Sequence, residues 1–273
     1  MGSTTRPSEA ECAGTGPGGG RAWVGRELPG AAREPRGLLR DIFLAQPEAT
    51  LRALAGRATF RWPADPSVVV KRYSAQDWRD LWHDLVRGRA RSIAQREADN
   101  LRELARAGMA VPRPLGWCDS GALGARSAMW MEHLEHCGSL RDLAVRAPAA
   151  AARFVPELAR AVGRLHTQGW YHRDLYLAHW LVTGVGLALV DVGRVRRERA
   201  PRERWFVKDL AALLYSCPAT VSAHARLRFL VLYLDAREIS SHDARRSFAR
   251  AVLAKAARIA AHVPRWRDPV TGQ

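Results

Sequence analysis

A lysine, a glutamate and two aspartates occur in this chain in a combination that suits the transfer of a phosphoryl group. Lys71 follows three valines in SVVVKRY, Glu97 lies in the stretch 93–107, Asp174 lies in HRDL and Asp191 lies in DVG. This chemistry needs a cation on the nucleotide phosphates, a carboxylate beside the attacking hydroxyl, and metal ions that neutralise charge. Each of these requirements has a candidate here.

Secondary structure must hold these residues in place, and the apolar pattern predicts it. The β-branched run 67–73 predicts a strand that contains Lys71. Apolar residues at helical spacing over 93–107, followed by a glycine and two prolines, predict a helix whose inner face carries Glu97. A second helix is expected over 154–168, where apolar residues again recur at helical spacing.

A predicted hairpin brings the two aspartates together. The short apolar runs 180–182 and 187–190 flank a TGVG turn. The residues that enter the first strand of an antiparallel hairpin and those that leave the second lie at the same end. We therefore expect Asp174 and Asp191 side by side, although they are 17 positions apart. The segment from 206 to about 263 is rich in Ala, Leu and Arg and predicts a helical bundle.

The composition is that of a globular protein with an unusual basic excess. Its 273 residues, 47% hydrophobic and 26% charged, fit one large domain or two joined lobes. Lysines and arginines number 43 against 27 acidic residues, and the formal net charge of +16 favours phosphate-rich partners such as nucleic acid, anionic lipid or a nucleotide. Only three of the basic residues are lysines, so each lysine needs a specific explanation.

The ends of the chain and its cysteines carry further predictions. Residues 1–37 are rich in Gly, Pro and Arg without apolar periodicity, which predicts a disordered tail, and 264–273 are expected to form a second tail. No apolar run is long enough to span a bilayer, and the chain does not open with a secretory pattern, which predicts the cytoplasm. Four cysteines at irregular spacings predict free thiols.

Taken in order, these features resemble the protein kinases. A strand lysine, a helix glutamate, LHxxGxxHRD at 165–174, a hairpin and then D-x-G follow one another along the chain. The resemblance implies an α+β, two-lobed, protein-kinase-like fold with ATP and Mg²⁺ in its cleft. A small lobe of β-sheet plus helix, which binds the nucleotide, is expected over 38–131. A larger, mainly helical lobe with the catalytic and acceptor-binding residues is expected over 132–263.

The same resemblance implies roles for the individual residues. Lys71, held by Glu97, binds the nucleotide phosphates, Asp174 accepts the proton of the acceptor hydroxyl, and Asp191 holds Mg²⁺. His179 stands five residues after Asp174, where protein kinases carry a metal-binding Asn. Because hard cations prefer oxygen ligands, His179 either joins Asp191 on the metal or contacts the phosphates or the loop directly.

Further roles follow from position in such a fold. The segment AGRATF offers a single glycine in place of a glycine-rich loop, and its Arg57 is available to the phosphates. Glu132 and Leu134 in MEHL stand at the expected hinge and present backbone groups to adenine. Asp209 either caps the catalytic loop from below or is an ordinary acidic residue near a helix start. The residues expected to organise the catalytic loop are His172, Arg173 and Asp209.

The basic run after Asp191 has two interpretations. It is either a solvated loop, or a surface that binds phosphates of the acceptor or anionic headgroups of a membrane. Its members nearest the expected catalytic cleft are Arg194, Arg196 and Arg197.

Longer segments resemble the lipopolysaccharide core kinase family, the heptose and Kdo (3-deoxy-octulosonate) kinases. They are HRDLYLAHWLV, AGRATFRW at 55–62, READNLRELARAGMAVPRPLGW at 96–117 and RWFVKDLAALLYS at 204–216. The resemblance implies ATP-dependent phosphorylation of a heptose or Kdo hydroxyl in the lipopolysaccharide inner core. It also implies a lipopolysaccharide or lipid A-core glycolipid as acceptor, peripheral contact with the cytoplasmic face of the inner membrane, and no nucleic acid partner.

Two other functions remain as alternatives. The first is a small-molecule phosphotransferase of the antibiotic-kinase type, which the arginine-rich run after Asp191 disfavours. The second is a catalytically silent kinase-like protein that binds anionic lipid or nucleic acid through its net charge. The joint presence of Lys71, Glu97, Asp174 and Asp191 disfavours this second alternative, because a scaffold needs none of them in combination.

Overall fold

The computed structural model describes residues 14–15, 20–46, 50–54, 56–74, 91–121 and 126–261. Contacts divide the chain into two compact units, Met1–Leu134 and Glu135–Gln273, which we call the first unit and the second unit. The first is built on a β-sheet and the second consists mainly of helices, so the predicted α+β class is confirmed.

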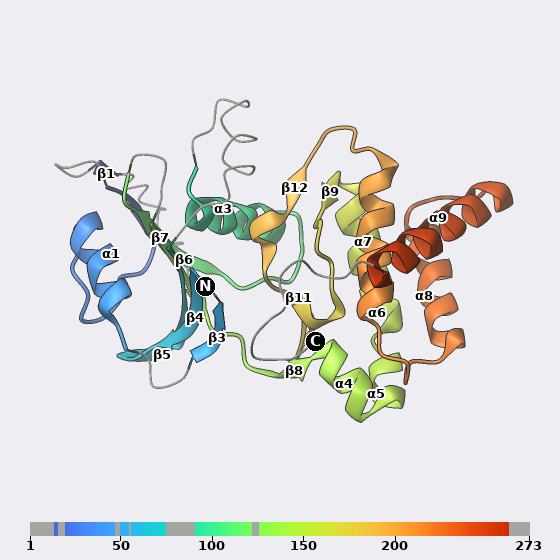
Figure 1. Cartoon of the computed structure of the whole chain (residues 1–273), viewed down its shortest axis with the longest axis horizontal. Coiled ribbons are helices and arrows are strands. Elements are labelled where there is room, and N and C mark those ends of the chain that lie inside the picture. Colours follow the sequence, from blue (N-terminus) through green and yellow to red (C-terminus); the bar gives the residue numbers. More distant parts are fainter. Residues whose placement is uncertain are drawn as a thin grey trace, which may run out of the picture. The chain divides into compact units, whose positions relative to one another are not determined.

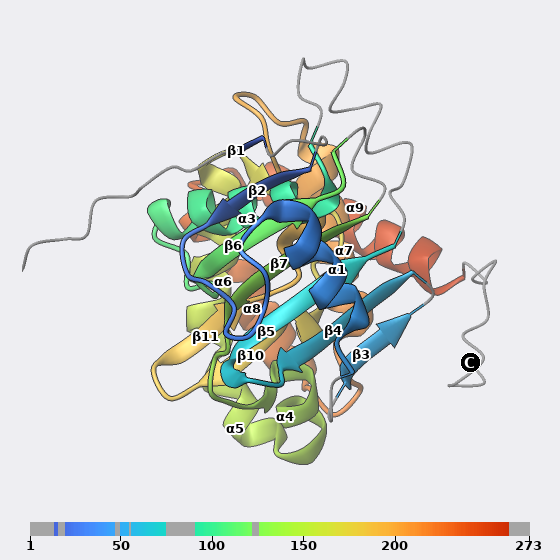
Figure 2. The ribbon, with the colours of Figure 1, turned by 90° about the vertical axis from the view of Figure 1, so that its left-hand side faces the viewer.

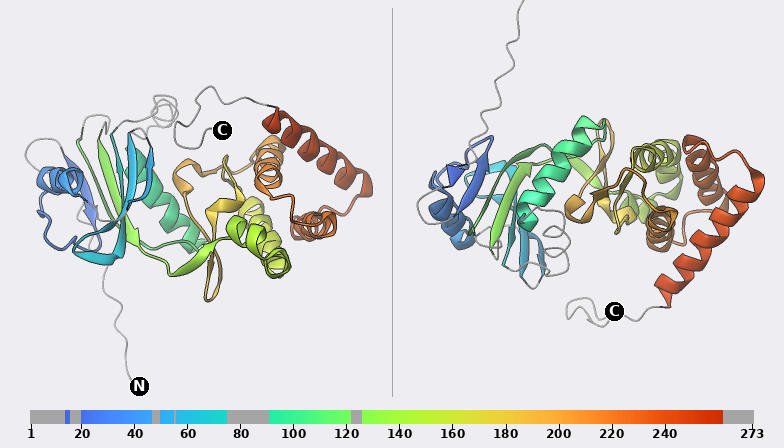
Figure 3. Two further views of the ribbon diagram at one scale, coloured as in Figure 1. Left: turned by 60° about the horizontal axis from the view of Figure 1, so that its bottom comes forward. Right: turned by 90° about the horizontal axis from the view of Figure 1, so that it is seen from above.

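A seven-stranded antiparallel sheet forms the frame of the first unit (Figure 1). Its strands lie in the order β1-β2-β6-β7-β5-β4-β3. Their bounds are β1 (Gly14–Thr15), β2 (Arg21–Val24), β3 (Thr50–Leu54), β4 (Arg57–Trp62), β5 (Asp65–Tyr73), β6 (Pro114–Asp119) and β7 (Ser127–Glu132). Helices α1 (Pro35–Leu44) and α3 (Ile93–Arg106) cover opposite faces of this sheet, as Figures 2 and 3 show.

The two faces of strand β5 carry different side chains, apolar on one and polar on the other. Successive side chains of a strand point to opposite faces. Val68 and Val70 belong to the buried cluster that packs against α1, while Lys71 and Tyr73 contact Glu97 of α3 on the other face. The predicted lysine strand is therefore confirmed, and its alternation determines which helix the lysine meets.

Helix α3 has clear start and stop signals. The Ser92 side chain accepts a hydrogen bond from the backbone N–H of Gln95 and caps the first turn. Gly108, with a φ of +77°, follows the last turn, and the N–H of Met109 donates to the carbonyl of Leu104. These caps agree with the helix predicted over 93–107. Glu97 lies on its inner face and is 1% exposed.

The prediction of a disordered tail over residues 1–37 is wrong for residues 14–15, which form β1, and for residues 20–37. Residues 21–24 form β2, which pairs with β6, and α1 begins at Pro35 with Glu34 as its N-cap. The cause is tertiary, because Arg21 reaches the fully buried Asp119 of β6 at 2.8 Å. Strand pairing, this ion pair and the burial of Ala22 and Leu28 in the core offset the ordering entropy of the segment. Residues 1–13, 16–19 and the predicted tail 264–273 lie outside the described residues.

Six helices and two small sheets make up the described part of the second unit. The helices are α4 (Leu140–Arg146), α5 (Pro148–Ala152), α6 (Val155–Thr167), α7 (Glu203–Ser216), α8 (Ala223–Ala236) and α9 (His242–Ala260). Helix α6 packs on α8 and α7 packs on α9 (Figure 3). The strands are β8 (His136–Ser139), β9 (Trp170–Tyr171), β10 (Trp180–Thr183), β11 (Gly186–Leu189) and β12 (Arg196–Arg197). The helix expected over 154–168 and the helical bundle that follows 206 are both confirmed.

The predicted hairpin is present as β10 and β11. Trp180 pairs with Leu189 and Thr183 with Gly186 in antiparallel register. The 3₁₀ turn η2 (Leu177–His179) precedes β10, and the 3₁₀ turn η3 (Val192–Arg194) comes shortly after β11. The residues before and after the hairpin therefore meet at one end, as expected.

The described residues contain neither a membrane-spanning helix nor a disulfide bond. None of the helices within the described ranges has the length and apolar character needed to cross a membrane. Cys118, Cys137 and Cys217 are free thiols, as predicted, and Cys12 lies outside the described residues.

Candidate active site

A buried ion pair occupies the sheet face beneath α3. One carboxylate oxygen of Glu97 accepts a hydrogen bond from Lys71 Nζ, and the other accepts one from the hydroxyl of Tyr73. Lys71 is 5% exposed, so the pair is almost fully shielded from water. Removing one member would leave a buried charge uncompensated, at a cost of about 3–5 kcal/mol. The contact holds the lysine in a defined direction.

Tyr73 was not among the residues proposed from the sequence. It stands two positions after Lys71 on β5, and a spacing of two places both side chains on the same face of a strand. Arg57 of β4 pairs with Tyr73 in the sheet, and its guanidinium carbon lies 5.3 Å from the centre of the Tyr73 ring. Gly56, just before Arg57, has a φ of +76°, a conformation that favours glycine.

The expected hinge lies at the end of β7. Glu132 is the last residue of that strand, and its backbone N–H donates to the carbonyl of Arg113 at 2.9 Å. Leu134 is half-buried and is the last residue of the first unit. The N–H of Glu132 is thus already engaged within the sheet, so its predicted contact with adenine would need another backbone group.

In the second unit, Asp174 meets two cations. Arg194 Nη1 donates to Asp174 Oδ2 at 2.6 Å, and Lys208 Nζ lies 4.0 Å from Asp174 Oδ1. The Asp174 side chain is 24% exposed, so its carboxylate is accessible to a ligand. Sequence reasoning assigned no role to Lys208, and the only signal was the scarcity of lysine in so basic a chain.

His179 connects the two aspartates. Its Nδ1 lies 3.0 Å from the backbone carbonyl oxygen of Asp174, and its Nε2 lies 3.6 Å from Asp191 Oδ2. The N–H of Val190 also donates to the His179 carbonyl at 2.9 Å. Asp191 has left-handed backbone angles, with φ 59° and ψ 50°. The structure thus places His179 between the two aspartates, at the end of the hairpin where the sequence predicted that Asp174 and Asp191 meet.

The donor set at His179 and Asp191 fits a cation. A carbonyl oxygen only accepts hydrogen bonds, so His179 Nδ1 carries a ring proton, and Nε2 on the other side of the ring faces Asp191. Two electron-rich atoms 3.6 Å apart repel each other unless a metal ion or a second ring proton lies between them. If a divalent cation binds here, the carboxylate of Asp191 and Nε2 of His179 are the groups that would hold it.

A metal centre made wholly of protein ligands is not present in the described ranges. No group of three or more His, Cys, Asp or Glu side chains within them has the arrangement to hold a metal ion. Mg²⁺ in phosphoryl-transfer sites is held by one or two carboxylates together with substrate phosphates and water, and a single carboxylate such as that of Asp191 is compatible with such a site.

Asp209 of α7 lies beneath the loop that carries Asp174. It is fully buried, and its two carboxylate oxygens accept hydrogen bonds from the backbone N–H groups of His172, at 2.5 Å, and Arg173, at 2.7 Å. Arg173 has a φ of 74°, which costs energy for a residue other than glycine. The two hydrogen bonds hold the loop in this conformation.

A buried network extends from Asp209 into the helices. His166 Nε2 lies 3.3 Å from Asp209 Oδ2, and His166 Nδ1 lies 2.7 Å from the hydroxyl of Tyr233. Burial lowers the pKa of His166, against the opposing effect of Asp209. A neutral His166 with its proton on Nε2 satisfies both contacts, because it donates to the carboxylate and accepts from the tyrosine.

His172 belongs to the same loop and is fully buried. Its ring stacks on that of His179, with 5.7 Å between the ring centroids. Its two ring nitrogens have no hydrogen-bond partner among the residues that the structure describes. His172 therefore contributes to the loop through packing and through its backbone N–H.

The basic run after Asp191 is largely engaged with the second unit itself. Arg194 binds Asp174, as described above. Arg196 and Arg197 form β12, which pairs with β9, and the Arg197 guanidinium carbon lies 5.4 Å from the centre of the Trp170 ring. Arg197 Nε also donates to the carbonyl of Gln168 at 3.3 Å.

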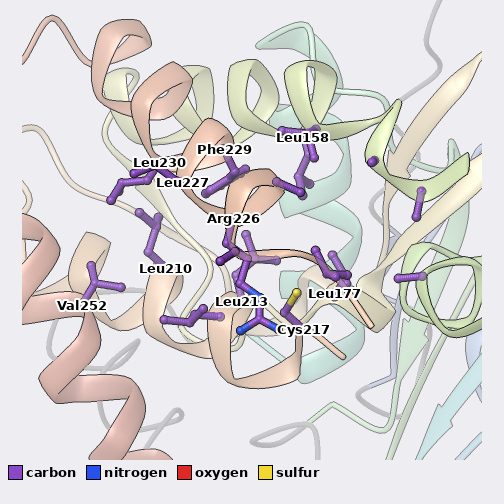
Figure 4. Close-up of a pocket in the computed structure, with 18 of the residues that line it drawn as sticks. Leu158, Leu177, Leu210, Leu213, Cys217, Arg226, Leu227, Phe229, Leu230 and Val252 are labelled. Carbon is purple, nitrogen blue, oxygen red and sulfur yellow. The ribbon is translucent and has the colours of Figure 1, made fainter. Parts of the chain in front are cut away.

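A cavity of about 380 Å³ lies among the helices of the second unit (Figure 4). Its lining is almost wholly apolar and comes from α4 to α9 and η2. Leu227 and Leu253, both in this lining, are 60% and 61% exposed. The residues labelled in Figure 4 are Leu158, Leu177, Leu210, Leu213, Cys217, Arg226, Leu227, Phe229, Leu230 and Val252.

Comparisons with known proteins agree with this geometry. The profile of the family described as "Lipopolysaccharide kinase (Kdo/WaaP) family" matches residues 41–243. The chain is 28% identical over 215 residues to the lipopolysaccharide core heptose(I) kinase WaaP of Pseudomonas aeruginosa, an alignment that covers 71% of this chain and 80% of that protein. It is 38% identical over 130 residues to the 3-deoxy-D-manno-octulosonic acid kinase of Xanthomonas campestris, covering 46% of this chain and 49% of that one.

A solved structure is similar over most of the chain. It is that of WaaP in complex with acyl carrier protein, with a TM-score of 0.61 and 25% identity, covering 81% of this chain and 92% of that one. The family resemblance drawn from the motifs is confirmed. The family profile matches well over half of the residues of this chain. The chain therefore belongs to the lipopolysaccharide kinase (Kdo/WaaP) family.

Proposed function

We propose that this protein transfers the γ-phosphoryl group of ATP to a heptose or Kdo hydroxyl of the lipopolysaccharide inner core. The observation that carries the proposal is the pair of carboxylates Asp174 and Asp191, joined through His179 on a loop anchored by Asp209. The names of the similar kinases supply the substrate class, and the loop supplies the chemistry.

The first unit is proposed to bind the nucleotide. Lys71 would contact the phosphates of ATP as a point charge, and Glu97 with Tyr73 would hold it in position. Arg57, beside the turn at Gly56, would add a second cation for the phosphates. We place this nucleotide-binding lobe at 38–131 and the catalytic lobe at 132–263, in a two-lobed, protein-kinase-like fold.

The second unit is proposed to carry out the transfer. Asp174 would orient the acceptor hydroxyl and take its proton as the oxygen bonds to the γ-phosphorus and the bond to the leaving ADP breaks. Asp191, with or without His179, would hold Mg²⁺, which neutralises the phosphates when bound. Arg194 occupies one oxygen of Asp174 and would have to move when the acceptor hydroxyl binds there.

A lipopolysaccharide acceptor implies a membrane-bound substrate. We propose that the protein works in the cytoplasm, in peripheral contact with the inner membrane. Its formal net charge of +16 supports attraction to an anionic surface, at about 1 kcal/mol for each basic residue near that surface. Arg194, Arg196 and Arg197 are the candidates for contact with the acceptor or the membrane, and side chains of this run also have contacts within the second unit.

The test is transfer of labelled γ-phosphate from Mg-ATP to dephosphorylated lipopolysaccharide core in detergent. Wild type should label the glycolipid, and Asp174→Asn should not, while both bind ATP. Asp174→Asn keeps the shape of the side chain and removes only its basic oxygen. Equal labelling by this variant would refute the role of Asp174, and no labelling by wild type with intact ATP binding would refute the acceptor.

A second property, binding of an acyl carrier protein, is favoured by the apolar cavity of the second unit. The similar WaaP structure is a complex with acyl carrier protein. The cavity, at about 380 Å³, lies within the size range of ligand pockets, about 300–1,000 Å³, and its apolar lining suits an acyl chain. Leu213→Trp should fill the cavity and weaken binding of acylated carrier protein but not of the unacylated form. Unchanged binding of both forms would refute this use of the cavity.

A further inference from the structure

Lys208 forms a long ion pair with the proposed catalytic aspartate, at a separation beyond hydrogen-bond distance. It belongs to α7, and its Nζ lies 4.0 Å from Asp174 Oδ1. A hydrogen bond between these atoms would need about 2.7–3.2 Å. The separation leaves the ammonium group able to donate to an oxygen of a ligand that enters next to Asp174.

The position of Lys208 is set by the same helix turn that holds the loop. Asp209, its neighbour, accepts the two backbone hydrogen bonds of His172 and Arg173. Any shift of α7 would therefore move the lysine and the loop together. The Lys208 side chain is 29% exposed, so it is partly desolvated yet open to a ligand. Burial lowers the pKa of Lys208, while the negative charge of Asp174 opposes this effect.

The choice of lysine is informative in this chain. Of its 43 basic residues only three are lysines, and one of the others, Lys71, is the proposed nucleotide ligand. The arginine side chain ends in a rigid, planar guanidinium group. The lysine side chain carries a compact ammonium group on a flexible alkyl chain, so it can follow a group that moves. Asp174 already accepts a hydrogen bond from the guanidinium of Arg194, and a lysine beside it adds a cation of different shape.

We propose that Lys208 is a catalytic residue that binds the phosphoryl group during its transfer. The proposal rests on the kinase function proposed above. As the acceptor oxygen bonds to phosphorus, its proton passes to Asp174 and the bond to the leaving ADP oxygen breaks. The Lys208 ammonium contacts an equatorial oxygen of the phosphoryl group throughout, keeps its own protons, and neutralises charge that is greatest in the transition state.

The test compares Lys208→Met, Lys208→Arg and a matched control, Lys255→Met. Lys255 lies on α9, and Lys255→Met removes the same ammonium group at a position away from Asp174. Removing one stabilising donor of a transition state typically lowers kcat about 10²–10³-fold. We expect that loss for Lys208→Met, with the Kd for ATP changed less than threefold, partial recovery in Lys208→Arg, and wild-type values for Lys255→Met.

A second readout does not depend on turnover. Binding of ADP with aluminium fluoride, which imitates the phosphoryl group in flight, should weaken in Lys208→Met while binding of ADP alone is unchanged. A purely structural role would lower both affinities and the melting temperature together, which would overturn the proposal. Wild-type kcat in Lys208→Met would also overturn it. If wild type labels no core acceptor, the proposed function itself fails, a result distinct from an active wild type with an equally active Lys208→Met.

Discussion

The variant Asp209→Ala tests how the catalytic loop is held. It removes a carboxylate that accepts hydrogen bonds from the backbone N–H groups of both His172 and Arg173. Asp209 is fully buried, so water does not replace the lost acceptor. A buried donor left without a partner costs about 1–3 kcal/mol, so the two N–H groups together should lower the free energy of unfolding by about 2–6 kcal/mol.

This loss is large beside the total stability of a domain, about 5–15 kcal/mol. It also frees Arg173 from its left-handed backbone conformation, whose strain of about 1–3 kcal/mol would then be relieved by rearrangement of the loop. We therefore expect kcat to fall more than stability alone explains, measured at a temperature where the variant is still folded.

Urea denaturation followed by circular dichroism measures the loss of stability, with the exposed Asp243→Ala as control. Asp209→Asn is the conservative partner. It keeps one acceptor oxygen but turns an NH₂ group towards a backbone donor, so it should lose about half as much. If Asp209→Ala lowers the free energy of unfolding by less than about 1 kcal/mol, the smallest penalty for one unsatisfied donor, Asp209 does not hold the loop in this way.

Three further predictions rest on single contacts. Burial lowers the pKa of His166 below its usual 6.5, so the unfolded chain binds the extra proton first and stability should fall as pH drops below about 6.5. Urea denaturation at pH 7 and pH 5 measures this slope, which should be shallower in His166→Gln. Tyr73→Phe leaves one oxygen of Glu97 without its donor and should cost about 1–3 kcal/mol in a thermal melt; an unchanged melting temperature would count against this contact. Gly163→Ala would place a Cβ 2.6 Å from the Cβ of Ala236, so it should destabilise α6 against α8 by about 1–3 kcal/mol; a more stable variant would contradict this packing.

Local sequence patterns were sufficient to predict the strands and the helix that carry the candidate active-site residues. The valine run before Lys71, the helical spacing around Glu97 and the TGVG turn each act over a few residues, where chain geometry allows few alternatives. The antiparallel hairpin then required that the segments before and after it meet, and His179 indeed lies 3.6 Å from Asp191. These predictions succeeded because each depends on backbone geometry within a short segment.

Contacts between distant segments were beyond such reasoning. Residues 21–24 are too short a run to predict a strand, and they are ordered by pairing with β6, by the ion pair to Asp119 and by packing of Ala22 and Val24 on the core. Arg194 was expected to face an acceptor or a membrane, and its structural partner is Asp174. A side chain with several rotatable bonds has many possible partners, and which one it meets depends on the packing of whole elements.

The sequence by itself determined the family, the order of the elements and the residue types available for phosphoryl transfer. The tertiary structure decided which of those residues meet: Tyr73 on Glu97, Asp209 under the loop, and Lys208 beside Asp174. The physical reason is that α7 follows Asp174 only after a long connection, so its rotation and distance are set by burial of its apolar face. A one-residue change in that rotation would turn Lys208 away from Asp174.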